Sequence, residues 1–435
     1  MILIYVPKAT SRVIYLFRHI CKRILGLEVD FTTKIESFIA HEGPKFSYGK
    51  QQLGKELYFQ SVDLLFEHGL SDISPQVLDW EDTKCFFSVK NTSSALPFDI
   101  FAASFFLISR YEEYLPHVKD DKGRFVASES LAYKNKFLQD PVIEIWANKF
   151  FVIIKDRFPD IKSYKKLFHI APVISVSQTF AYNQKGVIRS LGGVLRDVWF
   201  LKFKEVSDRL KVILNFRKDP FNTFDFLIEL QKKKHREIRV MIGVGDYSTH
   251  EKNISYNNPV HQKLIKHIAD YIKVGLKVSY DAITDFDKLK KEKERIEVII
   301  NRQLKYSFCS FHKIRLPVAY RNLIELEVEE DYSLGYSEYA GFRAGTCTPF
   351  LFYDLDYEVQ TPLMIYPISV SYQSFVPGVD LETVKTRMLS ILEKVKEVNG
   401  VFVPVFSNGL FSELSDHEKW KTIFELIWNI DEEGD

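Results

Sequence analysis

Apolar positions in the first part of the chain fall into short runs and helical spacings. Residues 2–6 form an apolar run typical of a buried strand. Gly26 then follows a set of apolar residues that recur at helical spacing among basic ones: Val13, Phe17, Ile20 and Ile24. Further helices are predicted over 101–107 and 141–158. We therefore expect a smaller N-terminal domain of α/β or α+β type over residues 1–163.

Charged segments separate these elements. The cluster at 109–114, with one arginine and two glutamates, could bind a ligand, but it is more typical of a helix end with paired surface charges. Residues 119–124 predict a charged turn around Gly123. The segment 156–160 and the lysine-rich stretch after it form the best candidate for a linker. Nothing in this part has the spacing of a catalytic set.

From residue 164 to residue 435, apolar runs alternate with helical patterns. Strands are predicted over 173–176, 238–244, 276–280, 306–311, 364–371 and 401–406. Residues 189–215 are mainly helical in pattern, one later helix is predicted to stop at Gly275, and two more to begin at caps formed by Thr284 and Asp380. This alternation indicates a parallel sheet with helices outside it. The repetition predicts a (β/α) barrel, which could be incomplete.

One loop stands out in this part of the chain. Residues 341–350 are rich in Gly, Thr and Pro, and Arg343 lies there between two glycines with few other charges near it. A guanidinium in that setting requires an anion or a carbonyl. Pairing with a local carboxylate, Asp331 or Asp354, is one reading. The place of the loop in the strand–helix order favours the other, in which Arg343 faces a cleft at the strand ends.

Composition excludes several classes of protein. With 435 residues the chain is long enough for two domains, and its 46% hydrophobic content is normal for a globular protein. The formal net charge is +1, and the lysine runs have glutamates nearby, so no nucleic-acid partner is indicated. No apolar run is long enough to span a membrane, and the N-terminus lacks the basic start of a signal peptide.

The four cysteines are scattered and form no CxxC pair: Cys21, Cys85, Cys309 and Cys347. This arrangement argues against a structural zinc site and a disulfide framework, and it favours a reducing compartment. We therefore expect a cytoplasmic protein.

In parallel barrels the chemistry lies at the carboxyl ends of the strands. No glycine-rich phosphate-binding pattern follows any predicted strand, so a nucleotide fold lacks support. Most of the side chains expected at the strand ends are hydroxyls, with one carboxylate and no histidine: Ser175, Ser177, Asp246, Ser279, Ser310, Arg343, Ser371, Tyr372, Ser407 and Asn408, with Lys277 beside them.

Several short motifs occur together in this half of the chain: Ala181-Tyr182 followed by residues 189–193, Gly245-Asp246-Tyr247, residues 268–271, Leu316-Pro317 followed by residues 320–324, residues 331–336, and residues 341–350. In combination they resemble the bacterial polysaccharide deacetylase family, in a branch with an extra N-terminal domain of unknown function. The resemblance covers nearly the whole chain. It implies a distorted (β/α) barrel and metal-dependent removal of N-acetyl groups from sugar polymers.

The family chemistry requires residues that this chain lacks. A divalent metal needs one carboxylate and two imidazoles, a second carboxylate takes the proton of the water, and a further histidine protonates the leaving amine. By resemblance, the paired carboxylates of the first strand match Ser175 and Ser177. The two metal histidines match Lys277 and Ser310.

The remaining family positions are also changed, except one. The aspartate that tunes the late histidine matches Tyr372, that histidine matches Ser407, and the arginine is retained as Arg343. His312, two positions past the second expected ligand, is expected to be a surface residue. The histidines His250, His261 and His267 are not expected to be ligands, and Asp246 is expected to be a structural hydrogen-bonding residue. The family metal, zinc, is therefore predicted to be lost, and no cofactor is expected.

Three hypotheses follow from this pattern. The leading one is a non-catalytic relative that keeps a sugar-shaped cleft and binds glycan or partners an active deacetylase. The second is a hydrolase with an altered site built on Asp246, His312 and Arg343. The third is a structural protein whose cleft is filled by side chains such as Tyr372 and Phe406.

Overall fold

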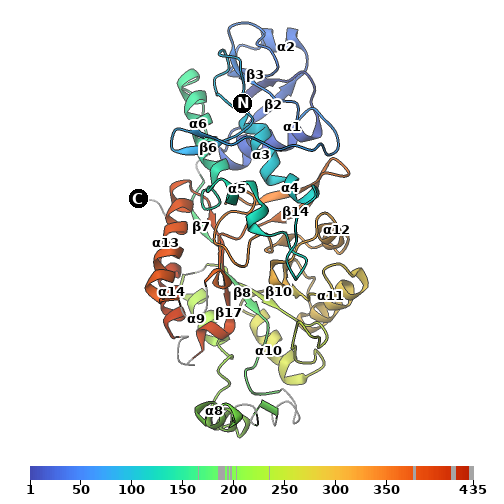
Figure 1. Cartoon of the computed structure of the whole chain (residues 1–435), viewed down its shortest axis with the longest axis vertical. Coiled ribbons are helices and arrows are strands. Elements are labelled where there is room, and N and C mark those ends of the chain that lie inside the picture. Colours follow the sequence, from blue (N-terminus) through green and yellow to red (C-terminus); the bar gives the residue numbers. More distant parts are fainter. Residues whose placement is uncertain are drawn as a thin grey trace.

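The computed structural model describes residues 1–164, 166–184, 192–193, 195, 198–201, 203–234, 236–375, 379–412 and 418–430. Figure 1 shows an elongated molecule with the N-terminal elements at one end and β8, β10 and β17 further along. The described residues form a four-stranded sheet, a nine-stranded sheet and two short two-stranded sheets.

The four-stranded sheet belongs to the N-terminal part. Its strands are all parallel and lie in the order β2 (Val29–Thr32), β1 (Ile2–Tyr5), β3 (Lys45–Gly49) and β4 (Leu57–Gln60). The predicted first strand and first helix are confirmed, although α1 (Ser11–Phe17) continues as a wider π-helical segment, η1 (Arg18–Ile24). Thr10 caps α1, because its hydroxyl accepts from the Val13 N–H at 3.1 Å.

Two other N-terminal helices fall where the apolar pattern predicts them, α3 (Ile100–Ile108) and α6 (Val142–Arg157). Three shorter helices were not predicted: α2 (Ile35–Ala40), α4 (Tyr111–Tyr114) and α5 (Leu131–Lys134). Asp99 caps α3, accepting from the N–H groups of Phe101 and Ala102 at 3.0 Å each. A small hairpin, β5 (Leu78–Trp80) and β6 (Thr83–Cys85), completes this part.

The nine-stranded sheet forms the C-terminal part and is parallel except at one edge. Its order is β13 (Phe350–Asp354), β14 (Val359–Ile365), β12 (Glu330–Asp331), β11 (Tyr306–Cys309), β10 (Lys273–Val278), β9 (Arg239–Ile242), β8 (Val173–Val176), β17 (Pro404–Ser407) and β15 (Val370–Ser371). The strand predicted over 364–371 is two strands, and β13 forms an unpredicted antiparallel hairpin with β14. Only residues 366–369 separate β14 from β15, so one segment pairs near both ends of the sheet.

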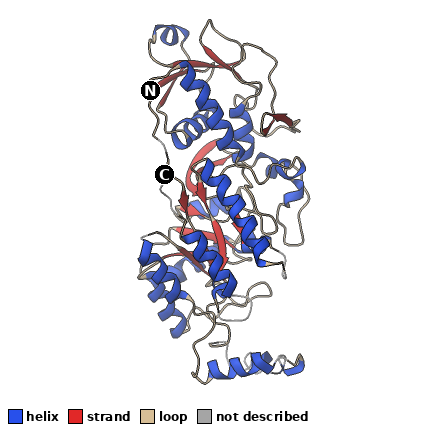
Figure 2. Ribbon diagram, turned by 90° about the vertical axis from the view of Figure 1, so that its left-hand side faces the viewer, coloured by secondary structure: helices blue, strands red, loops and turns tan. Residues whose placement is uncertain are grey.

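Helices alternate with these strands, as the sequence predicts for a parallel sheet. They are α8 (Phe203–Ile213), α9 (Phe224–Lys234), α10 (Pro259–Ala269), α11 (Phe286–Ile300), α12 (Val318–Glu325), α13 (Leu381–Glu397) and α14 (Glu418–Trp428). Two short strands, β16 (Val401–Phe402) and β7 (His169–Ile170), pair in parallel. In the sequence they come directly before β17 and β8 of the large sheet. Figure 2 shows the helices packed around the strands. The helical prediction over 189–215 is confirmed for α8, and its first residues lie outside the described ranges.

One face of the large sheet has its own core, separate from the main one. Because successive side chains of a strand point to opposite faces, Val173 and Ile174 enter different clusters. The smaller cluster takes side chains from strands around the sheet: Ala171, Val173, Met241, Phe308, Tyr332, Ile368, Val403 and Val405. This face continues toward the carboxyl ends of the strands as Ser175, Lys277 and Ser407, which places the predicted strand-end residues together.

Two predicted helix ends are wrong. Asp285, not Thr284, caps α11, because its side chain accepts from the Lys288 N–H. Helix α10 ends at Ala269, and Gly275 lies inside β10. A side chain at Gly275 would meet Met241 and would come within 2.8 Å of the Tyr306 carbonyl oxygen, so the glycine serves close packing on the strand.

We expect Gly275→Ala to lower the free energy of unfolding by about 1–3 kcal/mol, because the added methyl group overpacks this face. The measurement is urea denaturation followed by circular dichroism. Gly192→Ala is the matched control, since a Cβ there meets nothing within 4 Å. Equal stability of the two variants would show that Met241 and Tyr306 can move to accommodate the methyl group without lowering the free energy of unfolding.

The loop at 341–349 is held by the N-terminal part. Arg343 donates to Glu113 through Nε at 2.8 Å and Nη2 at 2.7 Å, and their side chains are 1% and 3% exposed. Arg110 also donates to Glu113 at 2.8 Å and to the carbonyl of Arg343. The prediction of a surface charge cluster at 109–114 is therefore wrong, because Arg110 and Glu113 are buried. Neither Asp331 nor Asp354 is the partner of Arg343.

A second carboxylate holds the same loop. Glu144 of α6 is buried and accepts from the N–H groups of Thr348 at 3.1 Å and Cys347 at 3.3 Å, and from the Thr346 hydroxyl. The candidate partners named from sequence are engaged elsewhere. Asp354 binds a different arginine, and Asp331 accepts from two serine hydroxyls.

Candidate functional site

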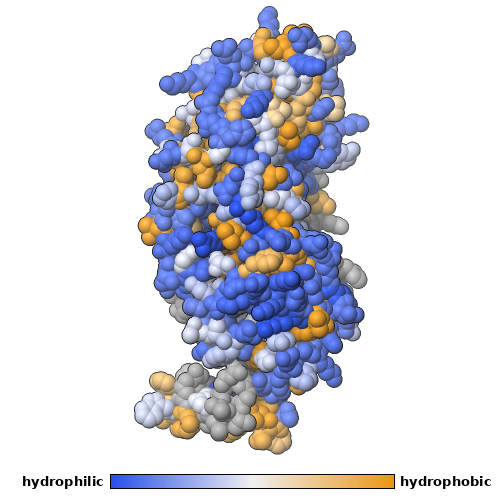
Figure 3. Space-filling model, turned by 90° about the vertical axis from the view of Figure 1, so that its right-hand side faces the viewer, coloured by the Kyte–Doolittle hydropathy of each residue, from blue (hydrophilic) through white to orange (hydrophobic). Residues whose placement is uncertain are grey.

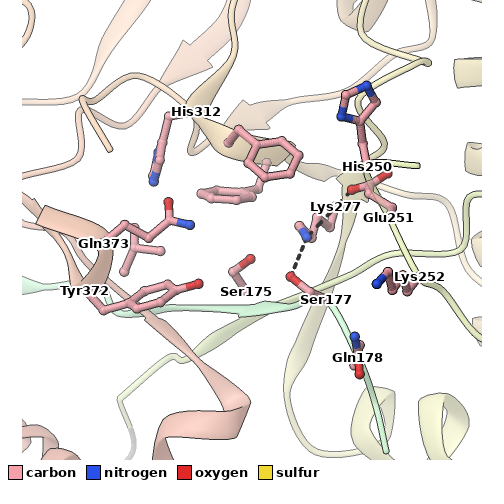
Figure 4. A pocket seen from close by; sticks show the side chains of 13 residues that line it. Ser175, Ser177, Gln178, His250, Glu251, Lys252, Lys277, His312, Tyr372 and Gln373 are labelled. Atoms are coloured by element: carbon pink, nitrogen blue, oxygen red, sulfur yellow. Dashed lines mark hydrogen bonds and ion pairs between the residues drawn. The ribbon is translucent and has the colours of Figure 1, made fainter. Parts of the chain in front are cut away.

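A pocket of about 230 Å³ opens at the carboxyl ends of β8, β10, β11 and β17 (Figure 4). Its polar lining consists of Ser175, Ser177, Gln178, His250, Glu251, Lys252, Lys277, His312, Tyr372 and Gln373. Phe308, Phe311 and Val405 complete the wall. The structure therefore brings four of the predicted residues together, namely Ser175, Ser177, Lys277 and Tyr372.

Strand register explains why these residues meet. Ser175 lies opposite Met241 on one side and opposite Ser407 on the other. Lys277 lies opposite Phe308. In parallel strands the carboxyl ends reach one edge of the sheet, so residues far apart in sequence converge there.

Lys277 is the central charge of the pocket. Its side chain is 8% exposed, its Nζ donates to the Ser177 hydroxyl oxygen at 2.6 Å, and the same Nζ lies 3.8 Å from Glu251 Oε1. Burial lowers the pKa of Lys277 below its usual range, and the charge of Glu251 opposes that shift. Lys277 Nζ is therefore held between a hydroxyl and a carboxylate (Figure 4).

Glu251 is a charged residue of the pocket that the sequence reasoning missed. It accepts from the Ser310 hydroxyl and from the Tyr280 N–H at 3.2 Å. It lies in the loop after β9, where only the first acidic residue, Asp246, was considered. Asp246 is exposed and pairs with Arg295 at 3.0 Å, outside the pocket lining. A search of the whole loop after each strand, rather than its first residues, could have found Glu251.

The other predicted residues lie close to the pocket but do not line it. Ser310 is buried behind Glu251, and Ser407 shares a hydrogen bond with the Tyr372 side chain. Arg343 does not line the pocket and is paired with Glu113.

His312 lines the pocket from a tight turn at the end of β11. Phe311 and His312 both have left-handed backbone conformations, with φ of 61° and 54°, which are costly for residues with side chains. The imidazole Nε2 lies 3.2 Å from the Ser371 hydroxyl. Burial, together with Arg124 and Arg343, lowers the pKa of His312 to about 3, so the ring is neutral near pH 7. The prediction that His312 is a surface residue is wrong.

The three other histidines named in the sequence analysis lie at separate places. His250 is exposed at the pocket rim, with its ring 4.0 Å from that of Tyr280. His261 is buried on α10, 2.9 Å from the Thr179 hydroxyl. His267 lies on the surface of α10, 3.6 Å from Asp225.

The N-terminal part supports residues at the pocket, although none of its own side chains lines it. Its turn around Gly123 is closed by a bridge between Lys119 and Phe125. The Tyr280 hydroxyl donates to the carbonyl of Lys122 at 3.1 Å, and Arg124 donates to the carbonyl of Phe311 at 3.1 Å. The turn therefore supports the two aromatic residues at the rim.

Behind the pocket, Glu292 of α11 accepts from the Ser279 N–H at 3.0 Å and from its hydroxyl. Burial, and then the nearby charge of Glu251, raises the pKa of Glu292 to about 7. A carboxyl whose folded-state pKa is raised stabilises the fold fully below its unfolded pKa, near 4.5, and this contribution is lost as pH rises through 7.

We therefore expect Glu292→Gln to gain stability relative to the wild type as pH rises from about 4 to about 8, by up to about 3 kcal/mol. Urea titrations at a series of pH values measure the difference. Glu294→Gln on the same helix is the control, because that side chain is exposed. A flat difference for Glu292→Gln would show that this carboxyl titrates normally.

The metal that the resemblance implies does not fit these residues. Among the described residues, no three His, Cys, Asp or Glu side chains are grouped so that they could hold a metal ion. Three of the matched positions, Ser175, Ser177 and Ser310, offer hydroxyls, and Lys277 brings a positive charge, which repels a cation. A separate finding concerns membranes: among the residues that the structure describes, no helix is long and apolar enough to cross one.

A family of unknown function, DUF7033, matches residues 2–159. No curated protein matches the chain.

Among solved structures, a protein from Mycobacterium smegmatis described as a polysaccharide deacetylase is 11% identical, with 62% of this chain and 88% of that one covered and a TM-score of 0.40. A CE4 family pseudoenzyme from Bacillus anthracis is 10% identical, with 61% and 62% covered and a TM-score of 0.29. PuuE allantoinase is 9% identical, with 60% and 85% covered and a TM-score of 0.38. Values this low carry no conclusion about activity.

Proposed function

We propose that the protein binds carbohydrate in the pocket without metal chemistry, as a non-catalytic glycan-binding or accessory protein in polysaccharide metabolism. The observation that carries this proposal is the position of Lys277, whose ammonium lies between Ser177 and Glu251 where a catalytic cation would be expected. Hydroxyls, carboxamides and two phenyl rings around it offer the hydrogen bonds and apolar contact that a sugar ring uses.

The proposal includes the architecture. The C-terminal part, from residue 164, is a distorted deacetylase-type (β/α) barrel, and residues 1–163 form a separate N-terminal domain. Its setting is cytoplasmic, its partner a glycan or an active deacetylase, and no metal cofactor is required. The pocket is slightly smaller than the roughly 300 Å³ at which pockets for drug-sized ligands begin, so it suits one sugar residue of a polymer. An open pocket also counts against the structural-protein hypothesis.

The test is calorimetric titration with a tetramer of β-1,4-linked N-acetylglucosamine, together with assays of acetate release and of zinc content. We expect binding without acetate release. The double variant Gln178→Ala/Gln373→Ala should weaken binding about tenfold, since each carboxamide contributes roughly one hydrogen bond. Gln303→Ala, away from the pocket, should bind as the wild type does. About one zinc per chain with acetate release, or no glycan binding, would overturn the proposal.

A second candidate function is hydrolysis through Ser177. The hydrolase built on Asp246, His312 and Arg343 is not proposed, because Asp246 and Arg343 lie outside the pocket. Instead, Ser177 lies 2.6 Å from Lys277, which is within reach for a lysine to act as general base. Ser177 would attack an acyl carbon, Lys277 would pass the serine proton to the leaving group, and water would release the acyl group. Glu251 favours the charged lysine, which places this candidate second.

Incubation with p-nitrophenyl acetate tests the second candidate. A covalent acetyl group on Ser177, detected by mass spectrometry and absent from Ser177→Ala, would support it. Unmodified protein and no p-nitrophenol release above the Ser177→Ala background would rule it out.

A further inference from the structure

An appendage follows the first strand of the large sheet. The chain leaves β8 at Ser177 and re-enters the body at α9, and α8 lies between them. Figures 1 and 2 both show α8 standing off from the body, at the end opposite the N-terminal sheet. Residues 192–218 take no part in the pocket lining.

The base of the appendage is held by specific contacts. Val212 is buried against Ala181 and Tyr182, and the guanidinium of Arg209 lies 4.8 Å from the centre of the Tyr182 ring. Asp219 accepts from the N–H groups of Ala181 and Tyr182 at 2.7 and 2.9 Å. One side of α8 is therefore anchored to the body, and its other sides are free to meet a partner.

The unanchored sides carry large apolar side chains. Trp199 and Phe216 are 83% and 81% exposed, and eight more apolar residues of the segment are exposed with them: Leu195, Val198, Phe200, Leu201, Phe203, Leu210, Ile213 and Leu214. Figure 3 shows several hydrophobic residues at the sides of this projection. Soluble proteins rarely leave so many neighbouring apolar side chains in water without a partner.

Charge decides between the candidate partners. Residues 192–218 contain seven Lys and Arg and three Asp and Glu. Exposed Lys211 and Lys218 lie among the apolar positions of the segment. A second copy of the chain would bring an equal positive charge against this surface, whereas an anionic lipid surface complements it. A tryptophan with several Phe and Leu side chains, next to basic residues, is also the composition of helices that lie in a membrane interface.

We propose that the appendage, residues 192–218, docks the protein peripherally on an anionic lipid bilayer. The exposed apolar side chains enter the boundary between headgroups and acyl chains, and Lys211 and Lys218 face the phosphates. This inference does not depend on the proposed glycan binding, since the pocket and the appendage share no residues.

The test uses the full chain and vesicles made of equal parts phosphatidylglycerol and phosphatidylcholine, with pure phosphatidylcholine vesicles for comparison. We expect co-sedimentation with the anionic vesicles, weaker binding at high salt, and weak binding to the neutral vesicles. The variant Trp199→Ser/Phe200→Ser/Leu201→Ser should lose binding at least about tenfold, because it removes three exposed apolar side chains.

The control variant Ile39→Ser/Val152→Ser/Val298→Ser removes three exposed apolar side chains elsewhere and should bind as the wild type does. Circular dichroism confirms that both variants fold. Absence of binding to anionic vesicles, or equal loss in both variants, would overturn the proposal. A wild-type dimer in sedimentation velocity that the first variant abolishes, without vesicle binding, would assign the surface to a second copy and also overturn it.

Discussion

Replacing Glu113 by glutamine is expected to lower the free energy of unfolding by about 3–5 kcal/mol. This carboxylate is buried between Arg110 and Arg343 and accepts hydrogen bonds from both guanidiniums. Without its charge, Arg343 keeps only neutral partners in the interior, and Arg110 keeps Glu112 as its one charged partner among the described residues. Urea denaturation at pH 7 measures the effect.

The same variant has an expected pH signature. In the wild type, burial raises the pKa of Glu113, but the charges of Arg343 and Arg110 outweigh this effect and lower the pKa to about 2. A carboxyl whose folded-state pKa is depressed stabilises the fold above its unfolded pKa, near 4.5, and loses that contribution as pH falls toward 2. The difference between wild type and Glu113→Gln should therefore shrink as pH falls from about 5 to about 2.

Glu338→Gln is the matched control for Glu113→Gln. Glu338 also pairs with an arginine, Arg124, at 3.0 Å, but its side chain is mostly exposed. The change there should cost less than about 1 kcal/mol, because water screens an exposed pair. If the two variants were equally stable, the buried cluster would contribute nothing beyond a surface ion pair.

The second large effect is expected from Glu144→Ala, at about 2–4 kcal/mol of unfolding free energy. The substitution removes the acceptor for the Thr346 hydroxyl and the Cys347 and Thr348 N–H groups in a buried loop. Thermal and urea denaturation both report the loss.

Glu81→Ala serves as the control for Glu144→Ala, since Glu81 is exposed and binds Lys149 on the same helix, α6. It should cost less than about 1 kcal/mol. A small effect of Glu144→Ala would mean that the loop finds other acceptors for its N–H groups.

Sequence periodicity was sufficient for most strands and helices of the C-terminal part, because buried parallel strands and amphipathic helices each leave a repeating apolar pattern. The periodicity misled at glycine, which can either end a helix or allow close packing within a strand. A glycine after a helical pattern predicts a helix end, and Gly275 instead accommodates Met241 across neighbouring strands. That contact depends on the pairing of β9 with β10, which no local pattern encodes.

The candidate site was predictable to the same degree. Strand ends could be located, and Ser175, Ser177, Lys277 and Tyr372 do meet in one pocket. The partners of the charged residues could not be found, because Glu113 and Arg343 lie 230 positions apart. Local carboxylates were the only candidates visible from sequence, and the structure gives them other partners. The proposed role of this pocket in glycan binding stays a prediction, and the glycan titration tests it.

The pairing of Glu113 with Arg343 limits how this protein can be divided or recombined. A C-terminal fragment produced alone would expose the Arg343 guanidinium and its glycine-rich loop, which are buried in the full chain. Such a fragment should aggregate or require a solubility tag. If one part is replaced by its counterpart from a diverged relative, the hybrid should not fold unless Arg110, Glu113 and Glu144 are kept together with the loop that they bind. The two parts are therefore expected to be inherited as a single unit.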